Sequence, residues 1–224
     1  MNLQKETTEK RIELKEVFRA KDRMLVESAI KFSTFSFGTT YPQRQVNSIY
    51  YDTFDFESLE ESIEGGSQRK KVRLRWYGNM KDDTKATLEI KMKRGHLSWK
   101  KIYRNSHNIK PQSKQWRNFI EIASNESSFN CILCNLVPQS IVSYQRSYFA
   151  SFDGKIRITI DHDLKTYIQN NTFVRNFDYG KSHKDVLVLE IKIAEKNQPL
   201  LRKILEEFPF SPKRFSKYCE SMLL

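Results

Sequence analysis

The sequence predicts an α+β fold in which about eight strands form a mostly antiparallel sheet with helices packed outside it. Several segments alternate charged and apolar residues, helical patterns fall between them, and no flexible linker or low-complexity tract divides the chain. About eight strands are enough to close a β-barrel. Because a barrel of this kind commonly occupies the whole of a chain of 224 residues, we expect a single domain over residues 1–224.

Strands are expected wherever β-branched, aromatic or alternating residues gather in a short run. Charged residues occupy every second position in the runs 11–15, 71–75, 88–93 and 189–192. Successive strand residues point to opposite faces, so each of these runs presents one apolar face and one charged face. In order, the expected strands cover residues 10–18, 45–51, 69–78, 84–93, 98–104, 141–151, 155–161 and 186–194.

Helices are expected between and after these strands. Apolar residues at helical spacing indicate a helix over residues 22–32 and one or two more within residues 116–136. Pro199 suits the first turn of a helix over residues 199–208, and a last helix over residues 212–224 follows the break at Phe208-Pro209.

The chain is strongly basic, with 39 lysines and arginines against 27 acidic residues and a formal net charge of +12. This balance indicates an anionic partner: nucleic acid, polyphosphate, a nucleotide or a membrane surface. No run of residues approaches the ~18 consecutive apolar residues of a membrane span. Three cysteines are too few, and odd in number, for a disulfide framework, so we expect a cytoplasmic protein.

The charged strand faces carry mostly positive residues. An ordinary antiparallel sheet with one solvated face also alternates in this way, but it favours opposite charges across its strands. If the strands close into a barrel with these faces inward, they enclose a basic cavity. Two further strands contribute Arg146 and Arg157 as bidentate phosphate donors. The charged faces themselves carry Arg11, Lys15, Lys71, Arg73, Arg75, Lys91, Lys93 and Lys192.

Three glutamates share these charged faces. Glu13, Glu89 and Glu190 each precede a lysine by two positions, so acid and base point the same way in a strand. Carboxylates are the hard oxygen ligands that Mg²⁺ and Mn²⁺ require. Each could instead form an ordinary cross-strand ion pair, and Glu190 is the preferred metal ligand of the three.

Eight short motifs follow one another along nearly the whole chain. They are Arg11-x-Glu-x-Lys15, Tyr50-Tyr51-Asp52-Thr53, Lys71-x-Arg-x-Arg75, Leu88-Glu-Ile-Lys91, Tyr144-x-Arg146, Arg157-x-Thr-x-Asp161, Leu189-Glu-Ile-Lys192 and Ser216-Lys217-Tyr218. Each motif alone is weak, but their order resembles the VTC-type polyphosphate polymerase domain. That domain belongs to the CYTH-like superfamily of triphosphate tunnel metalloenzymes.

The resemblance implies an eight-stranded antiparallel tunnel, closed by the C-terminal helix, that transfers the terminal phosphoryl group of ATP to a growing polyphosphate with Mn²⁺ or Mg²⁺. Expected metal ligands are Glu190, Glu13 and Glu89, and expected catalytic residues are Arg73, Lys217 and Glu190. ATP and polyphosphate are the expected partners, without nucleic acid, and a separate membrane subunit could place the protein at the cytoplasmic face of a membrane. The expected phosphate-binding residues are Lys15, Lys71, Arg73, Arg75, Lys91, Lys93, Arg146, Arg157, Lys192 and Lys217.

One motif departs from the wider superfamily. Its hydrolytic branch opens with Glu-x-Glu-x-Lys, whereas this chain has Arg11 in place of the first acid. Loss of that carboxylate weakens the case for hydrolysis and favours a polymerase. A triphosphatase of the same fold, an inactive relative that only binds polyphosphate, and a non-enzymatic polyanion- or RNA-binding module remain alternatives.

Overall fold

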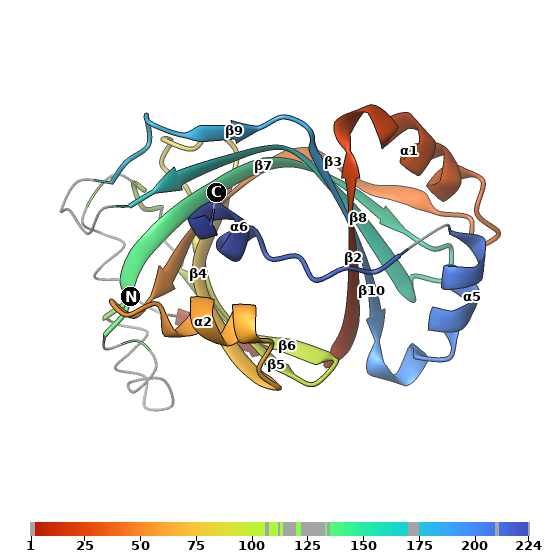
Figure 1. Ribbon diagram of the computed structural model, residues 1–224, viewed down its shortest axis with the longest axis horizontal. Helices are drawn as coiled ribbons and strands as arrows, with labels where there is room; N and C mark the ends of the chain where they lie inside the picture. Colours follow the sequence, from red (N-terminus) through yellow and green to blue (C-terminus); the bar gives the residue numbers. More distant parts are fainter. Residues whose placement is uncertain are drawn as a thin grey trace.

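The computed structural model describes residues 3–105, 108–111, 113, 120–121, 133, 135–169, 175–208 and 211–223. Long antiparallel strands dominate it (Figure 1). The helices expected within residues 116–136 lie almost entirely outside the described residues. The strands are β1 (Leu3–Thr7), β2 (Arg11–Arg19), β3 (Gly38–Asp52), β4 (Gln68–Tyr77), β5 (Thr87–Arg94), β6 (Leu97–Asn105), β7 (Val137–Ala150), β8 (Ile156–Ile168), β9 (Lys181–His183) and β10 (Val186–Ala194).

Within the described residues, eight strands close into an antiparallel barrel, which confirms the expected fold class. Around the barrel the neighbours follow the order β6, β2, β10, β8, β7, β3, β4 and β5, and pairing of β5 with β6 completes the circle. β1 adds a further strand by pairing with residues 101–105 of β6, and β9 pairs with β8. β1 and β9 are not among the expected strands, because both are short and lack alternation.

Most of the apolar core lies outside the barrel, between its wall and the covering segments, while a smaller cluster that includes Tyr50, Tyr144 and Tyr218 lies on the inner side. Ile158 and Ile191 face the helices α1 (Arg23–Lys31) and α5 (Leu200–Glu207), where Ile30 and Ile204 complete the cluster. On another side Leu74 packs in a second cluster with residues of β3 and β5. In the strands with strict alternation the outward residues are apolar, so the charged residues between them point to the interior.

A β-bulge adjusts this alternation in β8. The register between β7 and β8 shifts between Ser143 and Gln145, and Asp163 on the opposite strand has a positive φ of 53°. The extra residue keeps Asp161 on the inner face while it returns Leu164 to the same face, where Leu164 packs against α6 (Lys217–Leu223).

The C-terminal segment crosses one opening of the barrel. Figure 1 shows this segment running over the lumen into α6, with α2 (Glu57–Glu64) at the rim and α1 and α5 outside the wall. The predicted start of the last helix, at residue 212, is wrong: α6 begins at Lys217, and residues 211–216 are not helical. Ser211 and Lys213 instead donate backbone hydrogen bonds to β2, to Glu16 Oε2 and the Lys15 carbonyl, both at 2.8 Å.

Asp52 ties α2 and α6 to the end of β3. Its carboxylate accepts hydrogen bonds from the backbone N–H groups of Ser58 and Leu59 at 2.9 and 3.0 Å, as an acceptor before a helix does. The Tyr218 hydroxyl donates to the same carboxylate at 2.7 Å, and its ring stacks on Tyr50 with centroids 5.5 Å apart. α6 is therefore held against the barrel interior by buried contacts.

None of the described helices is long and apolar enough to cross a membrane.

Candidate functional site

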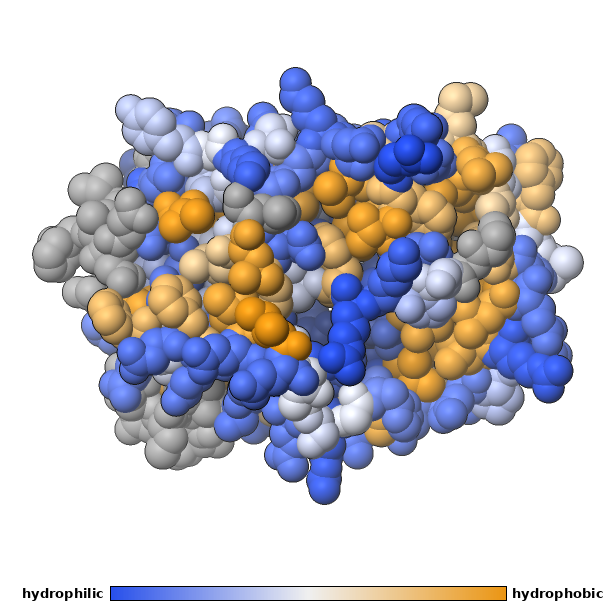
Figure 2. Space-filling model, in the orientation of Figure 1, coloured by the Kyte–Doolittle hydropathy of each residue, from blue (hydrophilic) through white to orange (hydrophobic). Residues whose placement is uncertain are grey.

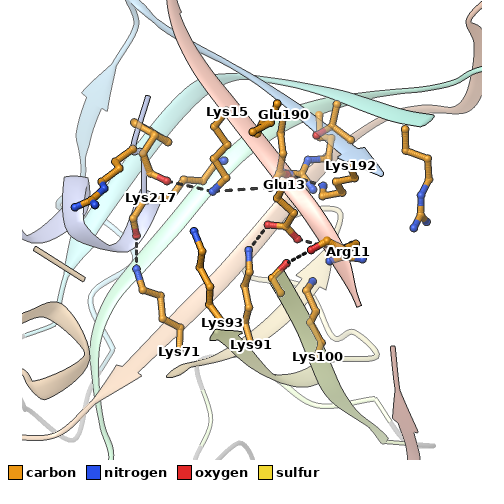
Figure 3. Close-up of a pocket in the computed structure, with 18 of the residues that line it drawn as sticks. Arg11, Glu13, Lys15, Lys71, Lys91, Lys93, Lys100, Glu190, Lys192 and Lys217 are labelled. Atoms are coloured by element: carbon orange, nitrogen blue, oxygen red, sulfur yellow. Dashed lines mark hydrogen bonds and ion pairs between the residues drawn. The ribbon is translucent and has the colours of Figure 1, made fainter. Parts of the chain in front are cut away.

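The barrel encloses a cavity of about 630 Å³ whose charged lining residues are mostly basic. Figure 2 shows a hollow at the centre of the face that the C-terminal segment crosses. All ten residues expected to bind phosphate line this cavity, as do Glu13 and Glu190. Figure 3 shows the lysines of β2, β4, β5 and β10 converging on the same space as Lys217 of α6.

The register explains this convergence. Residues paired directly across antiparallel strands point to the same face. Glu13 pairs with Lys192, which pairs with Arg157, and Lys15 pairs with Glu190. On the other side of the barrel Lys71 pairs with Lys91 and Arg73 with Glu89. The charged runs of the sequence are thus neighbouring rungs of one inner surface.

Glu190 lies among three cations. Lys192 Nζ is 2.6 Å from its Oε2, Arg146 Nη2 is 3.7 Å from the same oxygen, and Lys15 Nζ is 3.8 Å from Oε1. Burial alone would raise the pKa of Glu190, but Lys192 and Lys15 outweigh burial and hold the pKa well below its usual range. Glu190 is therefore ionised at neutral pH.

Glu13 is the second carboxylate of this region. Arg11 Nε lies 2.8 Å from Glu13 Oε1, and Lys91 contacts Oε2. The positive charge of Lys91 overcomes the effect of burial and lowers the pKa of Glu13 far below its ordinary value. Arg11, which stands where a hydrolytic motif has an acid, thus contacts Glu13 directly.

Glu89 contacts three cations. Its Oε2 accepts hydrogen bonds from Arg73 Nη2 at 2.8 Å and Lys100 Nζ at 2.7 Å, while Arg75 Nη1 lies 3.0 Å from Oε1. Burial would raise its pKa, yet Arg73 and Lys100 lower the pKa to about 2. The contacts favour a carboxylate that orients Arg73 and Arg75 over one that holds a metal, and the expected ligand role of Glu89 stays a prediction.

A buried network joins α6 to the barrel wall. Arg146 makes two contacts with Asp161, from Nε to Oδ1 at 2.5 Å and from Nη2 to Oδ2 at 2.7 Å. Lys217 Nζ reaches Asp161 Oδ2 at 2.5 Å and lies 4.6 Å from the centroid of the Tyr144 ring. Burial opposes it, but Asp161 still raises the pKa of Lys217 above its usual value. Lys217 is therefore a fixed positive charge facing the cavity.

Sequence reasoning missed four basic residues of the cavity wall. Arg69 continues the alternation of Lys71 and Arg73 and could have been found from it. Lys100 could not be recognised from the sequence, because Lys101 follows it and interrupts the alternation of charged and apolar residues. The remaining two come from the segment before α6, and only the folded chain brings them to the site. The missed residues are Arg69, Lys100, Lys213 and Arg214.

Among the described residues, no group of three or more histidine, cysteine or acidic side chains could hold a metal ion. Mg²⁺, however, is commonly bound through one or two carboxylates together with substrate phosphates. Glu13 and Glu190 come from adjacent strands, both are ionised, and both line the cavity. This donor set fits a divalent cation that arrives with a phosphate ligand.

Several lysines of the cavity have pKa values below the ordinary value for lysine. Burial lowers the pKa of Lys100 to about 7, an effect that Glu89 only partly offsets, and burial also lowers the pKa of Lys71. A bound polyanion would restore these protons, so the complex holds more protons than the free protein. By linkage, we expect affinity for tripolyphosphate to fall as pH rises through about 7.

Calorimetry in buffers of different ionisation enthalpy, from about pH 6 to about pH 9, measures this proton uptake. The ligand also exchanges protons on binding. A smaller proton uptake in the variant Lys100→Gln therefore shows how much of the uptake belongs to the protein. Equal uptake in both proteins, or an affinity that does not change with pH, would contradict the expectation.

Comparisons with known proteins agree with this geometry. The model of the VTC domain family matches residues 7–224. A solved structure from Hippeastrum, described as a putative adenylyl cyclase with a dominant triphosphatase activity, aligns with a TM-score of 0.54 at 14% identity and covers 96% of each chain.

A putative adenylate cyclase from Vibrio parahaemolyticus aligns with a TM-score of 0.53 at 14% identity, over 95% of this chain and 98% of that one. At this identity the likeness concerns the fold. A comparison with curated proteins finds no match to this sequence. The family model spans almost the whole chain and every element that lines the basic cavity, and the chain therefore belongs to the VTC domain family, with the barrel of the CYTH-like triphosphate tunnel proteins.

Proposed function

We propose that this protein is a polyphosphate polymerase that transfers the terminal phosphoryl group of ATP to inorganic polyphosphate. Membership of the VTC family supports a polyphosphate-related or triphosphatase enzyme. The observation that carries the proposal is the cavity wall, which combines fifteen lysines and arginines with the carboxylates of Glu13, Glu190 and Glu220. An inner surface with this excess of positive charge favours a polyanionic ligand.

The reaction needs little beyond position and charge. A terminal oxygen of the polyphosphate attacks the γ-phosphorus of ATP, the bond from γ-phosphorus to the bridging oxygen breaks, and ADP leaves with the electron pair. The attacking oxygen is already ionised, so no general base is required. Arg73, Arg75, Lys91 and Arg146 would hold the phosphates in line and neutralise the charge that spreads over the transferred group.

A divalent cation, Mn²⁺ or Mg²⁺, would be held by Glu190 and Glu13 and would add charge neutralisation at the phosphate oxygens. Lys217 lies on the α6 side of the same space and would contact the reacting end. Glu89 would keep the guanidinium groups of Arg73 and Arg75 in place before the substrate arrives. Such preorganisation avoids rearrangement at the moment of reaction.

Arg11 favours phosphoryl transfer to phosphate over hydrolysis. Its guanidinium contacts Glu13 at 2.8 Å, at the position where a second acid would help to activate water. A cation there attracts a phosphate oxygen instead. The decisive assay incubates the protein with ATP and Mn²⁺ and separates the products on a gel. Long chains are expected, whereas orthophosphate alone would indicate the triphosphatase and overturn the proposal.

Arg73→Ala tests the phosphate contacts. It removes a bidentate donor while leaving Glu89 paired with Lys100 and Arg75. We expect the KM for ATP to rise by about ten- to a hundredfold, since charge-assisted hydrogen bonds are worth about 1.5–3 kcal/mol. Initial rates over a range of ATP concentrations measure this. Arg202→Ala, on the exposed face of α5, serves as the matched control, and an equal KM in both variants would argue against the predicted role of Arg73.

The inner position of the cations also bears on nucleic-acid binding. A module that binds RNA presents its basic and aromatic residues on an accessible surface. Here the alternating cations line the cavity inside the barrel. Tight, salt-sensitive RNA binding without turnover of ATP would contradict the proposed function.

A further inference from the structure

Three tyrosines surround one arginine at the rim of the cavity, on β3, β4 and β7. The guanidinium carbon of Arg44 lies 4.6 Å from the ring centroid of Tyr41 and 5.8 Å from those of Tyr77 and Tyr148. The rings of Tyr41 and Tyr148 meet edge to face, with centroids 5.6 Å apart. We call these four residues the tyrosine cluster. In the described part of the chain no carboxylate pairs with Arg44.

The tyrosine cluster is open to solvent, unlike most aromatic residues of the barrel. Tyr41 is 52% exposed and Tyr77 is 42% exposed, whereas Tyr51, Tyr103 and Tyr144 are buried. Tyr41 and Tyr148 also line the basic cavity. Arg44 covers part of the Tyr41 ring and fixes its orientation, and the large exposed area of the ring remains available for contact with a planar group.

The register places the cluster on the same rung as Glu190. Tyr41 pairs with Tyr148, Tyr148 with Thr159, and Thr159 with Glu190, across four neighbouring strands. Neighbouring strands are about 4.8 Å apart, so the backbone of Tyr41 is roughly 14 Å along the wall from that of Glu190. This span is comparable to the distance between the base and the terminal phosphate of an extended nucleoside triphosphate.

A polar group without a partner lies between the two ends of this rung. The Thr159 hydroxyl is buried, the residue being only 6% exposed, and it has no hydrogen-bond partner within the described residues. Thr159 lines the cavity between Tyr148 and Glu190. A buried hydroxyl in this situation is costly unless a ligand or water satisfies it, which points to a polar ligand group that passes this position.

We propose that the tyrosine cluster is a nucleobase subsite, in which the base of the nucleotide stacks on Tyr41 while its phosphates extend past Thr159 toward Glu190. This inference rests on the proposed function in one respect, namely that a nucleotide enters the cavity. Stacking accepts any base, because every base has a π-face. The subsite therefore makes the protein prefer nucleoside triphosphates to inorganic triphosphate.

The test compares the binding of a nonhydrolysable ATP analogue with that of tripolyphosphate, by calorimetry on the full chain. In Tyr41→Ala we expect affinity for the ATP analogue to fall about tenfold, the usual effect of removing one stacked aromatic ring. Affinity for tripolyphosphate should stay unchanged, which also shows that the cavity is intact. Tyr41→Phe should keep the affinity for both ligands. Tyr179→Ala, at a residue 89% exposed and outside the cavity lining, is the matched control.

Equal weakening of both ligands in Tyr41→Ala would assign the cluster to phosphate binding or to the support of β3, and an unchanged affinity for the ATP analogue would exclude stacking. Either result overturns the subsite and leaves polymerase activity to be judged by its own product assay. Conversely, a selective loss of the ATP analogue supports the subsite even where no long-chain product forms. A wild-type protein that binds tripolyphosphate but not the analogue overturns the subsite as well.

Discussion

Glu190→Gln is expected to reduce polyphosphate synthesis on the order of a hundredfold or more, while the barrel, although destabilised by the loss of a buried counter-charge, still folds and still binds tripolyphosphate. Loss of an outer partner of a metal ligand already costs 10–100-fold in activity, and Glu190 is the predicted ligand itself. The amide is nearly the same size as the carboxylate, so the packing around it is preserved. Steady-state synthesis from ATP and Mn²⁺, measured together with thermal unfolding, checks both halves of the prediction.

Binding distinguishes this effect from a general loss of the site. Glu190 lies among Lys15, Lys192 and Arg146, and removing its charge makes their surroundings more positive. Tripolyphosphate without metal should therefore bind Glu190→Gln at least as tightly as it binds the wild type. Glu206→Gln, at an exposed glutamate of α5, is the matched control. Normal synthesis by Glu190→Gln would remove Glu190 from the reaction.

Asp161→Asn is expected to destabilise the fold by about 3–5 kcal/mol, the usual cost of removing one partner from a buried ion pair. The Asp161 side chain is 1% exposed and is the common partner of Arg146 and Lys217. Without the carboxylate charge, the two buried cations Arg146 and Lys217 have lost their common counter-charge at the start of α6. Unfolding in urea measures the change. The control Asp178→Asn removes an exposed pair with Lys81 and should differ little from the wild type.

The pH dependence gives a second check on Asp161. Burial would raise its pKa, but Arg146 and Lys217 lower the pKa from 3.8 to about 2. A carboxylate with a lowered pKa contributes stability above its unfolded pKa and loses it as pH falls through the folded value. The difference between wild type and Asp161→Asn should therefore be complete at neutral pH and shrink between about pH 4 and about pH 2. A difference that is constant over this range would contradict the electrostatic origin.

Much of the barrel could be predicted from the sequence because its two faces have opposite chemistry. In β4 and β10, strict alternation separates apolar residues such as Leu74 and Ile191 from Arg73 and Glu190, so both the strands and their inner faces follow from periodicity. A one-residue slip would turn every cation outward, so the register is strongly specified. The resemblance of the ordered motifs then indicated closure into a tunnel.

The parts that could not be predicted depend on tertiary contacts. Residues 211–216 contain no periodic signal, and their extended path is set by hydrogen bonds to β2, which brings Lys213 and Arg214 to the cavity. Arg214 packs so closely on Gly65 that a Cβ there would lie 2.3 Å from its Nη1. The contacts of Glu89 likewise cannot be predicted from the sequence, because Lys100 and Arg75 reach it from separate strands.

In the proposed reaction the inner cations of the barrel hold the triphosphate of ATP. A crystal structure with a nonhydrolysable ATP analogue and Mn²⁺ tests it most directly. We expect phosphate oxygens in contact with Arg73, Arg75, Lys91 and Arg146, and Mn²⁺ bound to Glu190. A nucleotide bound on the outside of the barrel, or a triphosphate that leaves these four side chains without contact, would contradict it.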